Sequence, residues 1–326
     1  MNKYHSQRLL PHRFASPPAN LPNHANVGLW YEKYCYTWDI EKVVTPKGKI
    51  DWKNTGSSPK YKTAWIDTVT RRKIGKKKEL QEACDRLSAL SEHMGGKSIP
   101  MESTSRFVTG IGQAHYVENG FSFHHTLGVP YIPGSSLKGM VRAWANEWAE
   151  WKNEEEQKQV MNRIFGPDNR KDGRKRDKKF DSDSRNGSNT DRNSDSDNRK
   201  NNTTDRSIGK ILFMDAIPMK PVKLEKDILT AHHMDYYGDL VKVMDGKKSV
   251  GKGRNPTDAD LVKPIPFLAM AKGHTFLFSF FPIEKYEEYK EDVKRVEGWL
   301  IYALQWMGAG AKTANGYGRF MLVPET

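Results

Sequence analysis

A glycine-rich stretch near residue 310 holds the residues whose types and spacing most clearly suggest chemistry. It reads WMGAGAKTANGYGRF, residues 306–320, with four glycines around a single Lys312-Thr313 pair. A Walker A loop places a glycine directly before its lysine and leads into a helix. Here Ala311 precedes the lysine, and residues 317–323 alternate as in a strand. We therefore expect no ATP-binding loop.

The same stretch favours a different phosphate ligand. Glycine tolerates positive φ and has no side chain to collide with a ligand, so this backbone can approach one closely. A lysine, short polar groups, a tyrosine ring and an arginine suit a sugar-phosphate backbone. A helix C-cap followed by a tight turn is the structural alternative, although four glycines in eleven residues exceed what a cap needs. The predicted RNA contacts in this loop are Gly308, Gly310, Lys312, Thr313, Asn315, Gly316, Tyr317 and Arg319.

A second candidate anion site lies in GVPYIPGSSLKGMVRAW. Apolar residues at spacings of three and four predict a helix that starts near Ser135, with a hydroxyl available to cap it. The free amides of a first helical turn attract anions, and two cations follow on the same side. The predicted RNA contacts here are Ser135, Ser136, Lys138 and Arg142.

Histidines are the obvious catalytic candidates. His115, His124 and His125, and the pair His232 and His233, are expected in loops or at strand ends. Two histidines that converge could cleave RNA without a metal, one taking the 2′-OH proton and one protonating the leaving oxygen. The sequence does not show convergence, so contact with RNA or an ordinary loop position is the favoured interpretation, with His232 and His233 as candidate RNA contacts.

Two further interpretations involve the segment around the second histidine pair. Tyr236 and Tyr237 follow it in a polar stretch and are predicted to stack on bases. Carboxylates near the histidines could bind Mn²⁺ or Zn²⁺, but their spacings match no ligand motif, and neighbouring residues of a strand point to opposite faces. We expect neither a metal nor another cofactor. The carboxylates considered are Asp215, Asp227 and Asp235.

Composition favours a polyanionic partner. The formal net charge is +13, which favours RNA or DNA over an acidic membrane. Residues 168–206 carry 12 Lys and Arg against 9 Asp, a net of +3, which leaves +10 for the rest of the chain. This stretch has one aromatic residue and is predicted to be a disordered or mobile insertion. The two cysteines form no CxxC motif, and a soluble, cytoplasmic protein with no membrane partner is expected.

The order of expected elements indicates an α+β fold. Periodicity predicts helices over 78–94, from Ser135 and over 285–307, and strands over 106–112, 209–218, 223–233, two within 264–283 and one over 317–323. The tryptophans 144, 148 and 151 are expected in the core. The order favours a ferredoxin-like or RRM-like sandwich with long insertions. The expected organisation is an N-terminal extension and helix over 1–100, a core domain over 101–326 and the polar insertion 168–206 within it.

Two segments together carry a resemblance to a known family. GIGQAHYVENGFSFHHTLGVPYIPGSSLKGMVRAW and, far downstream, GAGAKTANGYGRF resemble the RAMP superfamily of CRISPR-associated proteins, in which a glycine-rich loop follows a helix. The IPGSSLKG turn, DILTAHHMDYYGD and the form of the loop look most like the sixth-subunit family of type III-B Cmr effector complexes. The resemblance covers roughly residues 110–320 and is interrupted by the polar insertion, where this chain departs from a compact member.

The resemblance implies an RRM-like RAMP core and a structural role without catalysis. Such a subunit sits at the end of a filament of related proteins, binds the 3′ part of the guide RNA and helps to hold target RNA, while backbone subunits cut. The implied partners are guide and target RNA and the other RAMP, backbone and small subunits of the complex. Two alternatives remain open: a metal-independent RAMP endoribonuclease that processes CRISPR RNA through His115, His124 or His125, and a basic RNA chaperone without defined protein partners.

Overall fold

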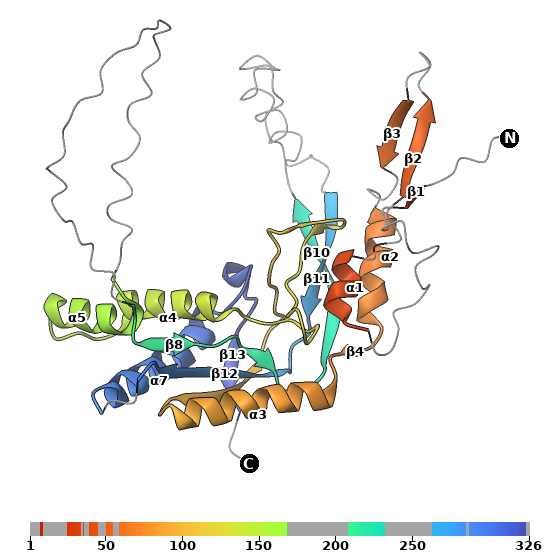
Figure 1. Cartoon of the computed structure of the whole chain (residues 1–326). Helices are drawn as coiled ribbons and strands as arrows, with labels where there is room; N and C mark the ends of the chain where they lie inside the picture. Colours follow the sequence, from red (N-terminus) through yellow and green to blue (C-terminus); the bar gives the residue numbers. More distant parts are fainter. Residues whose placement is uncertain are drawn as a thin grey trace, which may run out of the picture.

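The main sheet of the protein is antiparallel and lies between helices (Figure 1). Its strands are β5 (Lys97–Ser103), β8 (Ile211–Phe213), β9 (Ile217–Pro218), β12 (Thr275–Pro282) and β13 (Phe320–Leu322). Their order is β13-β5-β12-β8, and β9 also pairs with β12. The computed structural model describes residues 7–8, 25–33, 35, 39–44, 50–54, 59–167, 208–231, 263–284 and 287–323.

Strand β12 shows how the core is built on both faces of this sheet. Its residues Phe276, Phe278 and Phe280 join the large hydrophobic cluster, whereas Leu277 joins a separate cluster with Ala83. Successive strand residues point to opposite faces, so a strand covered on both sides is apolar throughout. This explains why TFLFSFFP does not alternate with polar residues.

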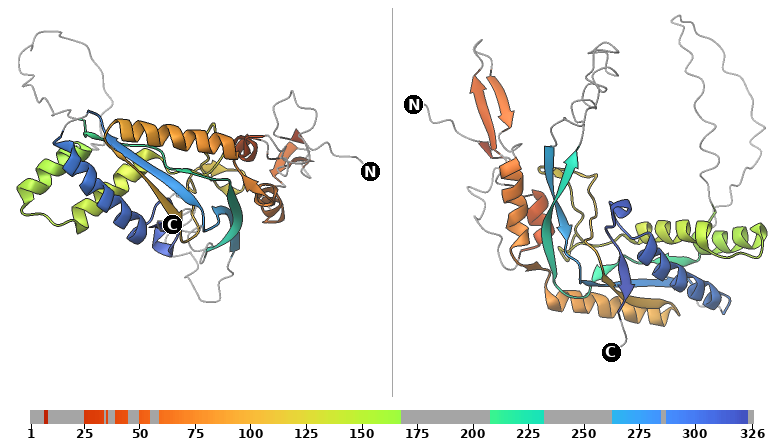
Figure 2. Two further views of the ribbon diagram at one scale, coloured as in Figure 1. Left: turned by 90° about the horizontal axis from the view of Figure 1, so that it is seen from below. Right: turned by 180° about the vertical axis from the view of Figure 1, so that it is seen from behind.

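Four helices cover the two faces. Helix α3 (Lys77–His93) packs on one face, and α4 (Gly134–Trp148), α5 (Glu154–Phe165) and α7 (Tyr289–Trp306) lie on the other (Figures 1 and 2). Strands β5 and β8 both pair antiparallel with β12, so β5 and β8 run in the same direction. Helix α4 follows β5 in the chain and runs in the opposite direction to it. Strands β12 and β13 both pair antiparallel with β5, so α7 runs in the direction of β5. Helix α4 therefore begins, and α7 ends, at the end of the sheet where β5 ends.

A long hairpin forms a second sheet. Strands β10 (Val222–Ala231) and β11 (Lys263–Met270) pair antiparallel, with Leu224 opposite Met270, and β4 (Lys73–Ile74) extends this sheet. Helix α2 (Pro59–Thr70) packs on the hairpin, beside α1 (Val27–Lys33). The smaller strands are β1 (Gln7–Arg8), β2 (Asp39–Val44) and β3 (Ile50–Asn54), which form one sheet, and the pair β6 (Ala114–His115) and β7 (Glu118–Asn119).

The expected mixture of helices and strands is confirmed, with differences at particular elements. The strand predicted over 106–112 is replaced by β5 at 97–103, and within that range only a bridge from Phe107 to Met270 remains. The predicted strand over 209–218 is split into β8 and β9. Helix α5 was not predicted, although Asn153 caps it by accepting a hydrogen bond from the Glu156 amide.

The prediction that three tryptophans lie in the core is wrong for Trp148. Its side chain is 61% exposed, because α4 ends there and the residue lies on the solvent side of the α4–α7 pair. Trp144 is half-buried and stacks on Trp148 and on Tyr302. Trp151 lies beyond the helix and packs on Trp299.

Several expectations fall outside the described residues. These are the polar insertion 168–206, most of the N-terminal 26 residues, and the segment with His232, His233, Asp235, Tyr236 and Tyr237. Within the described ranges, no helix combines the length and apolar character needed to cross a bilayer.

Candidate nucleic-acid interface

The glycine-rich loop runs from the end of α7 to β13 and includes the short 3-10 helix η4 (Thr313–Asn315). Its backbone is bonded to the segment that follows β5. The Ala311 amide donates to the Val108 carbonyl at 2.7 Å, and the Gly318 amide donates to the Arg106 carbonyl at 2.7 Å. The two limbs of the loop also meet, because the Ala309 amide donates to the Gly318 carbonyl. The loop is therefore fixed by contacts about 200 residues apart in sequence.

Three of the four glycines are required by this packing. A Cβ atom at Gly310 would lie 2.2 Å from the Val108 carbonyl oxygen, and one at Gly318 would lie 1.9 Å from the Ala309 carbonyl oxygen. At Gly308 it would meet the Arg319 side chain at 2.5 Å. Gly316 differs, since its Cβ direction is open and only its φ of +85° favours glycine. The close approach that three glycines permit is to the protein itself.

The outward part of the loop is the turn from Lys312 to Gly316. Lys312 adopts the left-handed conformation with φ +59°, and its Nζ lies 5.2 Å from the centre of the Phe267 ring. Within the described part of the chain its ammonium forms no ion pair with a carboxylate. Ala314, Asn315 and Gly316 are exposed. This turn presents a cation, an amide side chain and backbone groups to solvent.

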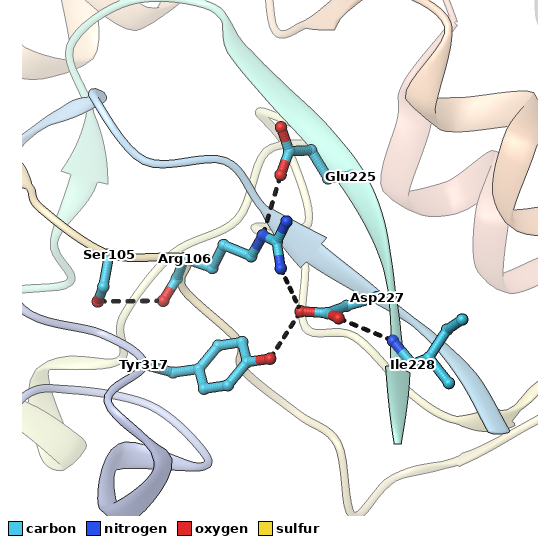
Figure 3. Close-up of polar contacts among 6 residues, drawn as sticks. All are labelled: Ser105, Arg106, Glu225, Asp227, Ile228 and Tyr317. Atoms are coloured by element: carbon cyan, nitrogen blue, oxygen red, sulfur yellow. Dashed lines mark hydrogen bonds and ion pairs between the residues drawn. The ribbon is translucent and has the colours of Figure 1, made fainter. Parts of the chain in front are cut away.

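Tyr317 ties the loop to the long hairpin (Figure 3). Its hydroxyl donates to Asp227 Oδ2 at 2.6 Å, and Arg106 Nη1 donates to the same oxygen at 2.9 Å. Arg106 Nε donates to Glu225 Oε2 at 3.1 Å, so the guanidinium lies between two carboxylates. Burial would raise the pKa of Asp227, but the bonds from Tyr317, the Ile228 amide and Arg106 outweigh it and lower that pKa. The pKa of Tyr317 is raised by burial and by Asp227.

Arg319 points back into the loop. Its Nη2 donates to the Thr313 carbonyl at 3.3 Å, and its buried Nη1 has no hydrogen-bond partner among the described residues. The guanidinium therefore stabilises η4 through its bond to Thr313 and places a positive charge inside the loop. Thr313 is half-buried at the start of η4.

The first turn of α4 has a different environment from the one expected. The prediction of a hydroxyl cap is wrong: the N-cap residue is Pro133, and the Gly134 amide donates to Asp215 Oδ1 at 2.8 Å. A carboxylate thus already occupies part of the positive end of the helix. Ser135 and Ser136 are exposed. Lys138 and Arg142 are four residues apart and therefore lie on one side of α4. Burial and the positive charge of Arg142 lower the pKa of the half-buried Lys138.

The structure brings two of the candidate histidines together. His115 and His125 line one hollow of about 610 Å³, together with Tyr116 and Tyr131. Both ring nitrogens of His115 have backbone partners, because Nδ1 accepts from the Val117 amide and Nε2 contacts the Tyr31 carbonyl. Burial lowers its pKa. His124 has a lowered pKa for the same reason, and its Nδ1 accepts from the Leu127 amide.

The carboxylates considered as metal ligands are separated. Asp215 caps α4, whereas Asp227 belongs to the cluster at the glycine-rich loop. No group of three or more potential metal ligands occurs within the ranges that the structure describes.

Sequence reasoning missed Arg106 and the role of Asp227. Arg106 and Asp227 each lie near a motif that the sequence analysis identified, but the hydrogen bond between them joins residues 121 positions apart. The apolar/polar alternation of β10 places Glu225 and Asp227 on the face opposite Leu224, yet nothing local reveals which cation they meet. The sequence signal was limited to two carboxylates on one face of a strand.

The chain has recognisable relatives. It is 28% identical to the CRISPR system Cmr subunit Cmr6 of Pyrococcus furiosus over 266 residues, which cover 75% of this chain and 72% of the relative. Its fold is similar to a chain in the type III-B Cmr-beta complex bound to cognate target RNA, with a TM-score of 0.51, 19% identity, and coverage of 81% of this chain and 72% of that chain. Crystalline Cmr6 of Pyrococcus furiosus aligns over 70% of this chain and 98% of that chain, at 23% identity and a TM-score of 0.35.

A family model gives the broader assignment. The model described as RAMP superfamily matches residues 93–321, from the end of α3 to β13. This range covers more than half of the chain and includes both the α4 turn and the glycine-rich loop. The chain belongs to the RAMP superfamily.

Proposed function

We propose that this protein is a non-catalytic subunit of a type III-B CRISPR ribonucleoprotein effector. In this role it binds the 3′ part of the guide RNA and helps to position target RNA at the end of the subunit filament. Its relatives support this proposal: Cmr6 is a subunit of the Cmr system, and the Cmr-beta complex is bound to target RNA. The net charge of +13 is consistent with an RNA partner.

Strand order supports a ferredoxin-like, RRM-like core. Numbered along the chain, β5, β8, β12 and β13 lie in the order 4-1-3-2. Helices α4 and α5 connect the first two of these strands, and α7 connects the last two, which gives the β-α-β-β-α-β sequence of that fold. We assign residues 101–326 to this core and residues 1–100 to an extension packed on it. Strand β5 starts at Lys97, so the last residues of the extension enter the sheet.

The observation that carries the RNA-binding proposal is the outward turn of the glycine-rich loop. Backbone bonds hold the loop in place, and its half-buried Lys312 and exposed Asn315 lie at the same end of the sheet where α4 begins. A rigid turn with a cation and backbone amides binds phosphates without reading the bases. The proposed RNA path joins this turn to Ser135, Ser136, Lys138 and Arg142.

Replacement of Lys312 by alanine tests this path. Loss of one phosphate contact should weaken RNA binding about fivefold at moderate salt, similarly for all sequences, and should reduce the slope of log K against log salt by about one. Lys294→Ala, an exposed lysine on α7, is the matched control and should change neither quantity beyond a small general charge effect. Equal affinities for the two variants would remove the loop from the RNA path.

A tagged purification tests the assignment to a complex. Other RAMP subunits, the small subunits and short spacer-derived RNAs should co-purify with the protein. Recovery with long, unprocessed repeat RNA and no protein partners would favour the alternative, a processing endoribonuclease.

The non-catalytic role and the endoribonuclease alternative predict different outcomes for repeat RNA. Repeat RNA incubated with the purified protein in EDTA should stay intact under the non-catalytic role, because the hollow lined by His115 and His125 contains a His115 ring whose two nitrogens both have backbone partners. Cleavage that is lost in His125→Ala would contradict the non-catalytic role.

A further inference from the structure

A second hollow lies directly beside the outward turn of the glycine-rich loop. Its volume is about 490 Å³, which is in the range of small-ligand sites. Four separate parts of the chain form it: the segment after β5, strand β10, the turn between β11 and β12, and the loop itself. Its lining residues are Arg106, Glu225, Lys272, Asn315, Gly316 and Tyr317. Three of them, Arg106, Glu225 and Lys272, were not among the predicted RNA contacts.

Two planar groups in this hollow are held in fixed positions. The Arg106 guanidinium is bonded to Glu225 on one side and to Asp227 on the other (Figure 3). The Tyr317 ring is fixed by its hydroxyl bond to Asp227 and by packing near Phe267, with ring centres 6.3 Å apart. Guanidinium planes and aromatic rings are the groups on which unpaired RNA bases stack. Because these side chains are already held in place, little side-chain entropy is lost when a base binds.

Glu225 supplies a hydrogen-bond acceptor at the same place. Its Oε2 already accepts from Arg106, but a carboxylate has about four acceptor positions, so most of its capacity remains. Guanine presents two adjacent donors, N1–H and N2–H, that match a carboxylate in a bidentate manner. Adenine and cytosine offer one amino group, and uracil flanks its single N–H with two carbonyl oxygens that a carboxylate repels. Lys272 is exposed at the rim, where a phosphate would lie.

We propose that this hollow binds one unstacked base of the RNA whose phosphates contact the glycine-rich loop, and that guanine is preferred. The proposal rests on the RNA-binding function proposed above. It adds a site of base recognition to a surface whose other contacts are to the backbone.

Fluorescence anisotropy with two short labelled RNAs tests the proposal. One is an oligouridine, and the other is the same RNA with a single central guanosine. The full-length protein should bind the guanosine-containing RNA about tenfold more tightly, as expected for one bidentate contact. Glu225→Gln keeps the shape of the side chain but replaces one acceptor oxygen by a donor. This variant should reduce the preference below about twofold and leave oligouridine affinity within about twofold of wild type.

Controls separate the failure of this inference from that of the proposed function. Glu82→Gln makes the same charge change at an exposed position on α3 and should keep the full preference. If wild type binds both RNAs equally while Lys312→Ala still weakens binding, the base pocket is overturned and the RNA path stands. If Glu225→Gln weakens both RNAs alike, Glu225 only positions Arg106, and the pocket is again overturned. If Lys312→Ala has no effect on either RNA, the proposed path itself fails.

Discussion

The glycine-rich loop and the first turn of α4 both lie at the end of the sheet where β5 ends, but they are built differently. The loop bonds its backbone to the segment after β5, and its side chains reach the β10–β11 hairpin. The α4 turn is local in sequence, and it meets a distant charged group through the bond from the Gly134 amide to Asp215. The loop is therefore a rigid platform whose polar groups are largely committed, whereas the turn is a helix end that already holds a carboxylate.

The difference shows that a motif can stand out in the sequence either because the fold needs its residues or because they are exposed to a ligand. In the loop, most of the glycines serve the fold, and the residues available to a ligand are the few at the outward turn. In the α4 turn, the hydroxyls are available, but a negative charge competes with any phosphate. At the loop, a phosphate would meet a backbone that is already held in place. At α4, it would meet a helix N-terminus whose Gly134 amide already donates to the Asp215 carboxylate.

The largest expected effect tests the structural role of the loop glycines. Gly318→Ala places a Cβ against the Ala309 carbonyl oxygen and forces alanine to φ +73°. The free energy of unfolding should fall by more than about 3 kcal/mol, since overpacking adds to the strain of a left-handed backbone. Gly316→Ala is the matched control: it has a similar positive φ but open space, and it should cost only about 1 kcal/mol. Chemical denaturation measures both, and equal losses would mean that the close contact is not what the glycine is needed for.

The next effect concerns the connection between the loop and the hairpin. Asp227→Asn removes the charge that receives bonds from Tyr317 and Arg106, and it should lower the free energy of unfolding by about 1–2 kcal/mol. Because the folded pKa of Asp227 is lowered, its contribution is fully present above the ordinary value of 3.8 and is lost as the pH falls through the lower folded value.

A double-mutant cycle with Tyr317→Phe isolates the hydroxyl bond. The two changes should be non-additive, because both remove the same contact. Strict additivity would show that the loop does not depend on this bond.

A smaller effect tests the competition at α4. Asp215→Asn keeps an oxygen that can accept the Gly134 amide but removes the negative charge. RNA affinity should rise by about two- to fivefold if a phosphate binds at this turn, as expected from removal of a nearby repulsive charge. Glu147→Gln, at the far end of the same helix, controls for the change in net charge. No difference between these variants in an anisotropy titration would exclude the α4 turn from the RNA path.

The smallest effect distinguishes the two regions by pH. Burial lowers the pKa of His124, which lines one hollow with Asp215, so protonation of the imidazole is less favourable in the folded protein than in the unfolded chain. The unfolded chain takes up a proton below the ordinary value of 6.5, and stability should therefore decline modestly as the pH falls from 7.5 to 5.5. His124→Asn retains an acceptor for the Leu127 amide and should show a shallower decline. The stability of Tyr317→Phe should decline as that of wild type does, because the pKa of its partner Asp227 lies below 3.8.

Local patterns predicted a substantial part of the fold. The helix expected over 78–94 is α3, the two strands expected within 264–283 are β11 and β12, and the final helix and strand are α7 and β13. These elements are long or are bounded by glycine, so short-range periodicity identifies them. Strand β5 was not predicted, because its sequence KSIPMES contains a proline and its apolar and polar residues alternate only weakly. Trp148 was misassigned because a stripe at helical spacing does not show where its helix ends.

The candidate site was less predictable for a physical reason. The loop and the α4 turn carry local signatures of glycine, hydroxyl and lysine. Asp215 at the α4 turn, and Arg106 and Glu225 at the loop, act through partners more than 80 residues away. Such pairings depend on strand register and sheet order, which a single sequence does not specify.

The bonds between the loop and the segment after β5 also set an order of events during synthesis. Among the described residues, the Val108 carbonyl pairs with the Ala311 amide, and residues 101–103 of β5 pair with β13. Until the ribosome has released β13, β5 presents an open edge of the kind on which other strands assemble. The same short segment closes the sheet and completes the proposed binding surface. A chain that has not yet reached β13 therefore leaves this edge of β5 unpaired and lacks the loop that we propose binds RNA.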